Sequence, residues 1–397
     1  MLVPKLRFRE FKNEWETIKL KQILSFKNGI NANKDSYGRG IKYISVGDIL
    51  NNTFITYDKI KGLVDINEKM LNENSVEYGD IVFQRSSETF NDIGQSNVYL
   101  DKEKVATFGG FVIRGKKVGN YNPLFLNYLL KSPYNRQKII IKGAGAQHYN
   151  ISQEELEKIN INFTNEKEQK KIANLFSLLD KKIELQKQKI EALKIYKRGL
   201  LYKTFSRCST NCKIKDLLTL GKSGGTPKST NISYYNGNIP FLSITDMTSQ
   251  GKYINYTEKH ISDIGLKNSS AWLLPVNTLI LSMYASYGLV SINKIELSTS
   301  QAMFNMIFKE NINIEYIYYY LNYLKETHFY DELVSTGTQS NLNADKVRNI
   351  PIYIPNETEQ YRISNLFNLL DKKIGFHQNI LNSLIIFKKS LLQQMFI

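Results

Sequence analysis

The sequence contains only two cysteines, Cys208 and Cys212, among its 397 residues. They have no second cysteine pair and no histidine near them, so we expect free thiols in a reducing compartment rather than a zinc site. No uninterrupted apolar stretch is long enough to span a bilayer, and the opening MLVPKLRFREF lacks the apolar run of a signal peptide. The sequence therefore predicts a cytoplasmic protein that does not cross a membrane.

Recognisable catalytic motifs are also missing. The histidines are scattered and form no metal-spaced pair, and no Ser/His/Asp or Cys/His set stands at a suggestive spacing. Gly221-Lys222-Ser223 resembles the end of a phosphate-binding loop, but Asp216 stands where that pattern requires a glycine. We therefore expect no catalytic residues, no metal and no cofactor in this chain, and we favour a binding protein.

Positive charge is the strongest feature of the composition. The net charge is +16, with excesses of +6 in residues 1–165, +6 in 166–205, +2 in 206–356 and +2 in 357–397. The charge is thus spread over the molecule and does not form a basic tail. A basic chain that is also rich in tyrosine and asparagine favours a polyanionic partner, with DNA or RNA the leading candidate.

A repeated stretch dominates the organisation of the chain. Residues 168–205 match residues 359–396 at a constant offset of 191, with 18 of the 38 aligned residues identical. Apolar residues recur in both copies at alternating steps of four and three, which is the seam of a coiled coil. Each seam turns polar at the same two places, Gln186/His377 and Lys197/Lys388, either because these side chains reach out to solvent or because they fix the register of the pair.

The two repeats are expected to pair within one chain. About eight residues link the first repeat to the next strand-like segment and reach at most ~28 Å, whereas a helix of this length measures roughly 57 Å. The second helix therefore most simply runs back antiparallel along the first.

The segments before the two helices echo each other more faintly. Tyr43–Ile49 resembles Phe241–Met247, and each half continues with short strand-like runs and a helix-like stretch, residues 123–131 and 315–325. We predict an α+β fold: two mixed α/β domains, residues 1–165 and 206–356, separated by two long antiparallel helices, 166–205 and 357–397, in a coiled coil with a pseudo-twofold internal repeat. Cys212 is expected to stand where the first domain has Trp15.

The candidate DNA-reading residues lie in polar loops at comparable places of the two halves. Arginine can pair with guanine and glutamine or asparagine with adenine, whereas lysine mostly contacts phosphate. For any single residue the alternative is a solvated loop, and the stronger argument is that two such loops arise at equivalent places. The candidates are Lys34, Arg39, Gln84, Arg85, Ser86, Ser87, Gln147 and His148 in the first half, and Thr226, Lys228, Ser229, Tyr284, Ser286, Tyr287, Gln339 and Asn341 in the second.

The order domain, helix, domain, helix resembles the DNA specificity subunit of Type I restriction-modification systems. The resemblance covers essentially the whole chain and rests on LFSLLDKKI and LFNLLDKKI in the helices, on Pro4–Phe8 with Trp15, and on the Gly-small-Gln loops before each helix. It implies two target recognition domains that each read half of a split DNA site, with the helices setting the unread gap.

The resemblance also implies partners and cofactors. The subunit itself would have no chemistry. It would assemble on double-stranded DNA with two methyltransferase subunits, which use S-adenosylmethionine to methylate adenine, and with restriction subunits that use ATP and Mg²⁺ to translocate and cut DNA. Two alternatives stay open at this point: a stand-alone nuclease or methyltransferase with an unrecognised site, and a coiled-coil scaffold that does not contact DNA.

Overall fold

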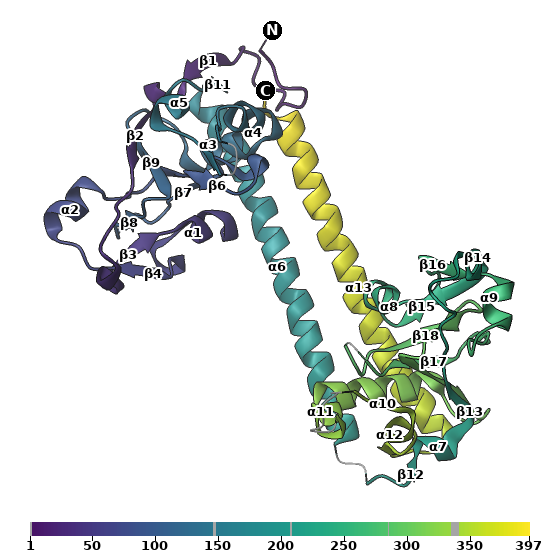
Figure 1. Ribbon diagram of the computed structural model, residues 1–397. Helices are drawn as coiled ribbons and strands as arrows, with labels where there is room; N and C mark the ends of the chain where they lie inside the picture. The colour runs from purple at the N-terminus through teal and green to yellow at the C-terminus, as the bar shows by residue number, and fades with distance from the viewer. Residues whose placement is uncertain (1, 146–147, 207–208, 285, 335–340) are drawn as a thin grey trace. The chain divides into compact units, whose positions relative to one another are not determined.

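The computed structural model describes residues 2–145, 148–206, 209–284, 286–334 and 341–397. Its contacts divide the chain into two compact units: unit 1 is Met1–Lys187 with Asn379–Ile397, and unit 2 is Gln188–Gln378. Two long helices, α6 (Glu166–Phe205) and α13 (Glu357–Gln394), carry the repeated stretch, as predicted (Figure 1). The division into two domains and two spacer helices stays a prediction, because the compact units cut across both helices.

The helices run antiparallel within each unit. In unit 1, Phe176 of α6 stacks on Phe396 after the end of α13, with ring centroids 5.7 Å apart, and Asp180 pairs with Lys388 at 2.5 Å. In unit 2, Lys197 pairs with Asp371 at 2.5 Å, and Phe205 stacks on Phe367. Residue numbers rise along α6 while their partners fall along α13. The polar seam residues Lys197 and Lys388 therefore each form an ion pair with an aspartate of the other long helix, which favours one register of the two helices.

Among its described residues, unit 1 joins eleven strands to five short α-helices and its parts of the two long ones. The strands are β1 (Glu16–Lys19), β2 (Leu24–Asn28), β3 (Tyr37–Ile44), β4 (Gly62–Val64), β5 (Ile81–Gln84), β6 (Ser86–Ser87), β7 (Ser96–Val98), β8 (Thr107–Phe108), β9 (Val112–Lys117), β10 (Tyr149–Asn150) and β11 (Asn160–Phe163). The short helices are α1 (Val46–Asn51), α2 (Glu68–Glu73), α3 (Pro123–Lys131), α4 (Pro133–Ile140) and α5 (Gln153–Glu157).

The unit 1 strands form a four-stranded sheet in the order β2-β9-β5-β7, a three-stranded sheet β4-β3-β8, and the pairs β1-β11 and β6-β10. β5 is buried along its whole length because it lies between β9 and β7. The main core joins this sheet to α3, α6 and the end of α13 through residues such as Phe83, Phe125, Phe176 and Phe396. A smaller core lies under β3 and β8.

Unit 2 repeats this arrangement. Its strands are β12 (Cys212–Lys213), β13 (Leu218–Ser223), β14 (Tyr235–Leu242), β15 (Tyr253–Ile254), β16 (Lys259–Ile261), β17 (Leu279–Ser282), β18 (Val290–Asn293), β19 (Ser298–Thr299), β20 (Met303–Phe308) and β21 (Pro351–Ile352). Its short helices are α7 (Ile214–Leu217), α8 (Ile244–Gln250), α9 (Asp263–Lys267), α10 (Ile314–Glu326), α11 (Phe329–Leu333) and α12 (Ala344–Arg348). The sheets are β13-β20-β17-β18-β15, β16-β14-β19 and β12-β21.

The two units share details of register and capping. β3 pairs antiparallel with β4 and parallel with β8, and β14 pairs in the same way with β16 and β19. Both antiparallel pairs have a shift of register at the same place. Ser45 and Asp48 form a capping box at α1, and Ser243 and Asp246 form one at α8. The faint echo of Tyr43–Ile49 in Phe241–Met247 therefore marks a common local structure.

The offset of 191 continues upstream of the long helices. Gln169 accepts a hydrogen bond from the Asn122 backbone N–H at 2.9 Å, and Gln360 accepts one from Asn313 at the same distance. Asn122 and Asn313 each cap the helix that follows, α3 or α10. These contacts join each domain to its long helix, and the matched positions show that the junction is part of the repeat.

The predicted equivalence of Cys212 and Trp15 is wrong. Cys212 pairs with Ile352 across β12 and β21 in the way that Ile18 pairs with Ile161 across β1 and β11, so Cys212 corresponds to Ile18. Cys212 is a free thiol, and Cys208 lies outside the described residues. Within the described part of the chain, no helix combines the length and apolar content needed to cross a bilayer.

Candidate nucleic-acid interface

Two of the predicted loops meet at the end of β5. The chain continues from β5 through Arg85 into β6, and β6 pairs antiparallel with β10, so that Ser86 lies opposite Asn150 and Ser87 opposite Tyr149. The Ser86 hydroxyl donates to Asn150 Oδ1 at 2.5 Å, and the Ile151 N–H donates to the Arg85 carbonyl at 3.0 Å. The polar stretch after β5 and the loop before β10 are thus joined.

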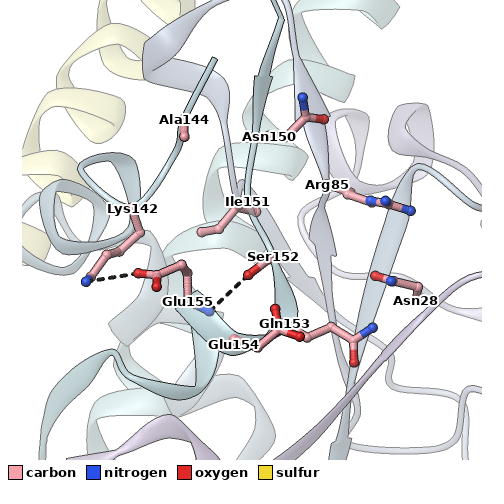
Figure 2. Close-up of a pocket in the computed structure, with 10 residues that line it drawn as sticks. All are labelled: Asn28, Arg85, Lys142, Ala144, Asn150, Ile151, Ser152, Gln153, Glu154 and Glu155. Atoms are coloured by element: carbon pink, nitrogen blue, oxygen red, sulfur yellow. Dashed lines mark hydrogen bonds and ion pairs between the residues drawn. The ribbon is translucent and has the colours of Figure 1, made fainter.

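A pocket of about 330 Å³ lies at this junction (Figure 2). Arg85 and Asn28 lie on one side of it, and Lys142 and Glu155 form a 3.0 Å ion pair on the other. Gln153 lies between them, with its amide oriented to donate to the Phe26 carbonyl at 3.0 Å and to accept from the Asn28 N–H at 3.1 Å. The remaining lining residues are Ala144, Asn150, Ile151, Ser152 and Glu154.

Arg85 and Lys142 are the positively charged residues that line the pocket, and of these two only Lys142 forms an ion pair with a described carboxylate. Arg85 Nη1 donates to the Gly110 carbonyl at 3.3 Å, and no described carboxylate forms an ion pair with it. Glu155, by contrast, pairs with both Lys158 and Lys142, and these bonds lower the pKa of its carboxyl. The guanidinium therefore keeps hydrogen-bond donors for an acceptor from outside, such as the O6 and N7 atoms of guanine or a phosphate oxygen.

Unit 2 has the same backbone junction with a different side chain. The Leu342 N–H donates to the Met283 carbonyl at 3.0 Å, as Ile151 does to Arg85, and the Met283 N–H donates to Ala302 as that of Arg85 does to Phe111. Met283 therefore corresponds to Arg85, but it is a buried core residue. The two loops do arise at equivalent places, and the position that carries a cation in unit 1 is apolar in unit 2.

The polar side chains of unit 2 lie farther along its loop. Tyr284 and Ser286 are exposed. Ser286 has a φ of 62°, which lies in the left-handed region that residues other than glycine seldom adopt. The Tyr287 hydroxyl donates to Asp331 Oδ1 at 2.6 Å, and His328 Nδ1 lies 2.8 Å from Asp331 Oδ2. These two contacts lower the pKa of the Asp331 carboxyl. Asn341 is half-buried beside this loop.

The other predicted residues are not among those that line the Arg85 pocket. Lys34 is exposed just before β3, and Arg39 on β3 forms an exposed 3.1 Å pair with Asp65. In unit 2, Lys228 and Ser229 are exposed in the loop after β13, and Thr226 donates from its hydroxyl to Gln301. His148 is exposed, whereas Gln147 and Gln339 lie outside the described residues.

Burial removes two residues from the predicted DNA-reading set, and the lining of the pocket adds others. Gln84 and Ser87 are buried, and Gln84 donates to the Ser86 carbonyl at 2.9 Å, so these side chains support the loop. Asn28, Lys142, Asn150 and Gln153 line the pocket but escaped the sequence prediction. Asn150 could have been found, because it closes the predicted loop at Gly145–Ile151; the others are single polar residues at the ends of ordinary strands and helices.

Exposed apolar residues recur on the long helices. Four pairs of large apolar residues related by the offset of 191 are each more than half exposed. The pairs are Leu178/Leu369, Leu185/Phe376, Ile195/Ile386 and Tyr196/Phe387. The exposure of these side chains is therefore part of the repeat.

Among the described residues, no group of three or more His, Cys, Asp and Glu side chains could hold a metal ion. The pocket beside Arg85 instead offers hydrogen-bond donors and acceptors, and its charged lining residues are Arg85, Lys142, Glu154 and Glu155, which suits binding to a polar group. Comparisons with known proteins add independent evidence. The family model for the Type I restriction modification DNA specificity domain matches the sequence twice, at residues 12–194 and 209–385.

Similar proteins point the same way. The putative type I restriction enzyme MjaX specificity subunit of Methanocaldococcus jannaschii is 24% identical, with 93% of this chain and 90% of that protein covered. The MjaIX specificity subunit of the same organism is 29% identical over 164 residues, which are 41% of this chain and 38% of the relative. The HindI specificity subunit of Haemophilus influenzae is 30% identical over 36% of this chain and 32% of its own length.

Solved structures share the fold at low sequence identity. The S subunit of a Type I restriction-modification system from M. genitalium covers 100% of this chain, with 99% of its own length aligned, a TM-score of 0.59 and 18% identity. A chain from a structural study of complex assembly and conformational transition in the type I R-M system covers 95%, with 96% of its own length aligned, a TM-score of 0.63 and 13% identity.

Proposed function

The chain belongs to the Type I restriction-modification DNA specificity family, and we propose that it recognises a split DNA site, with one half-site read by the domain of each unit. Its role is therefore DNA specificity and not catalysis. The observation that supports two readers is the pair of matched loops after β5 and β17. Their backbone hydrogen bonds are the same, while Arg85 in one is Met283 in the other. A shared frame with different side chains is what two readers of different sequences require.

In this proposal the readers are members of the predicted set that are exposed or half-buried. Arg85, Ser86 and His148 act in unit 1, with Asn28 and Asn150 beside them at the pocket. Tyr284, Ser286, Tyr287 and Asn341 act in unit 2. The phosphate contacts come from Lys34, Arg39 and Lys228, which are exposed cations outside the pocket. The pair between Arg39 and Asp65 is exposed to solvent, so the Arg39 guanidinium can exchange it for a phosphate. Thr226 and Ser229 belong to the same loop as Lys228.

The long helices serve as the docking site for two methyltransferase subunits. The support is the set of four exposed apolar pairs, which repeats once per helix and so provides two equivalent surfaces. Those subunits use S-adenosylmethionine to methylate adenine. Restriction subunits that use ATP and Mg²⁺ complete the assembly, so that this subunit itself holds none of these cofactors.

The helices also set the number of base pairs between the half-sites. Both are continuous, over 40 residues in α6 and 38 in α13, so a change of length in them changes the distance that they span. One added heptad lengthens a helix by about 10.5 Å, or about three base pairs of B-DNA.

Mapping methylated adenines in cells that carry this chain with its methyltransferase tests the proposal. We expect two short half-sites at a fixed gap, and a gap about three base pairs longer when one heptad is inserted into both α6 and α13. A matched variant with seven Gly and Ser residues after Ile397 should leave the gap unchanged. A single continuous site, or an unchanged gap in the heptad variant, would contradict the proposal.

A further inference from the structure

The amino-terminal segment of the chain is bound in a groove of unit 1. Arg7 donates to both carboxylate oxygens of Glu168 on α6, at 2.7 and 2.8 Å, and this pair is buried, with the Glu168 side chain fully shielded. The Leu6 N–H donates to the Gln394 carbonyl of α13 at 3.0 Å. Glu10 pairs with Lys171, whose ammonium lies 4.7 Å from the centre of the Phe8 ring.

Unit 2 contains the same groove. The offset of 191 relates Glu168 to Glu359, Lys171 to Arg362, Ile172 to Ile363 and Leu175 to Leu366. Around these residues lies a concave space of about 440 Å³. We define the unit 2 groove by Phe205, Tyr316, Tyr353, Glu359, Ile363 and Leu366.

Side chains that are covered in unit 1 are open in unit 2. Ile172 is buried beneath the amino-terminal segment, whereas Ile363 is half-buried, and Leu366 is 43% exposed. The Glu359 side chain is 36% exposed, against 0% for Glu168. Among the described residues of unit 2, no segment brings an arginine to Glu359 as Arg7 comes to Glu168.

Glu359 pairs instead with Arg362, and these two side chains line the groove together with Lys203. Arg362 donates to both oxygens of Glu359, at 2.7 and 2.6 Å, one turn apart on α13. An arriving arginine and glutamate three residues apart, like Arg7 and Glu10, could replace this exposed pair with two intermolecular ones. The arginine would face Glu359 and the glutamate Arg362, while the leucine and phenylalanine of the segment would cover Ile363 and Leu366.

We propose that the unit 2 groove binds an extended segment of a partner protein with the chemistry of Leu6–Glu10, namely Leu-Arg-Phe followed by an acid two residues later. A different protein is favoured over a second copy, because the amino-terminal segment of each copy is already held by the buried Arg7–Glu168 pair. This site lies outside the reading loops, and the inference does not depend on how DNA is recognised.

A synthetic peptide of residues 2–12, labelled with fluorescein and added to the full chain, tests the proposal by fluorescence anisotropy. We expect saturable binding of one peptide per chain. Replacing Arg7 with Ala in the peptide removes a two-point, charge-assisted contact and should weaken binding about tenfold or more. In the protein, Leu366→Lys and Glu359→Gln should weaken it as well, and both positions are exposed enough for the variants to fold.

The bound site is located by a photo-crosslinking peptide with benzoylphenylalanine in place of Phe8. We expect crosslinks to Tyr353, Ile363 or Leu366. Crosslinks confined to Ile172 and Leu175 would overturn the proposal, because the peptide would then have exchanged with the resident segment of unit 1. Absence of saturable binding would also overturn it. So would a concentration-dependent dimer of the chain that Arg7→Ala abolishes, since the occupant would then be a second copy.

Discussion

Arg85 of unit 1 and Met283 of unit 2 follow equivalent strands and accept the same backbone hydrogen bond, yet one is a half-buried cation at a pocket and the other a core side chain. The junctions between domain and long helix differ much less. Tyr128 donates to Asp180 and Tyr319 to Asp371, both at 2.7 Å, and each aspartate also pairs with a seam lysine. The repeat is thus kept where a domain meets its helix and changed at the loop that follows β5 or β17.

The aromatic clusters at the helix ends show a second kind of difference. Phe396 packs against Trp15 and Phe125 in unit 1, whereas its counterpart Phe205 packs against tyrosines of α10, among them Tyr320 at 5.3 Å. Both units take a ring from the matched helix, Phe125 of α3 or Tyr316 of α10. Unit 1 adds Trp15 from the segment before β1, whereas unit 2 adds Tyr320 of α10.

The largest expected effect comes from removing these central rings. Phe396→Ala and Phe205→Ala should each destabilise their own unit by about 3–5 kcal/mol, the usual cost of emptying a buried phenylalanine site. Hydrogen exchange followed by mass spectrometry reports the two units separately. We expect faster exchange in α3 for Phe396→Ala and in α10 for Phe205→Ala. Equal loosening of both units by either variant would show that the two clusters are not independent.

The next effect separates the two reading loops. Arg85→Ala should weaken discrimination at one half-site by about 1–3 kcal/mol, if the guanidinium contacts a base edge. Tyr284→Ala is the matched change on the loop of unit 2 and should affect only the other half-site. Binding of the assembled complex to DNAs altered in one half-site at a time measures both. A uniform loss across all DNAs for Arg85→Ala would show a phosphate contact instead.

The two long helices and their pairing could be predicted because the repeat is visible in the sequence. An identity of 18 in 38 residues at one offset predicted both long helices. The heptad seam predicted that they pair, and the short linker after the first helix predicted the antiparallel direction. The helix over residues 123–131 was also found at its true bounds, since Asn122 and Pro123 are typical of a helix start. The predicted match of Cys212 with Trp15 failed because the linker before β12 is shorter than the segment before β1.

The site was less predictable for a different reason. Loop sequences show which side chains are polar but not which of them are buried. Gln84 and Ser87 are buried, while neighbouring Arg85 reaches the pocket. These differences in burial follow from the pairing of β5 with β9 and of β6 with β10. Lys142 and Gln153 enter the pocket from segments far along the chain. Such contacts depend on tertiary packing, which has no local sequence signal.

A smaller effect is expected at the two aspartates of the seam. Asp180→Asn leaves Lys388 and the Tyr128 hydroxyl with a weaker partner, and should cost about 1–3 kcal/mol. Asp371→Asn should cost less, because the Asp371 side chain is 31% exposed and that of Asp180 only 13%. Unfolding in urea measures both. The double variant Asp180→Asn with Lys388→Met should regain part of the loss; a double variant as unstable as the sum of its parts would mean that the pair does not couple.

The smallest effect is the pH dependence that Lys131 of unit 1 should contribute. Burial, together with the charge of Lys388, lowers the pKa of Lys131 to about 8. The corresponding residue of unit 2 is the uncharged Asn322. Between that pKa and the unfolded value of about 10.4, the unfolded chain binds more protons, so stability from this group rises as pH rises. Below pH 8 the folded state must hold the charge, and this contribution is lost.

Lys131→Asn copies the residue of unit 2 and should remove this dependence. We expect the melting temperature of the wild-type chain to improve, relative to the variant, as the pH is raised from 7.5 to 10. The variant also loses the bond from the Lys131 ammonium to the Thr53 carbonyl at 3.1 Å. The test therefore compares how the difference between the two proteins changes with pH, not its size at one pH. Asn322→Lys provides the reverse test in unit 2. A constant difference between wild type and Lys131→Asn across this range would show that Lys131 keeps an ordinary pKa in the folded chain.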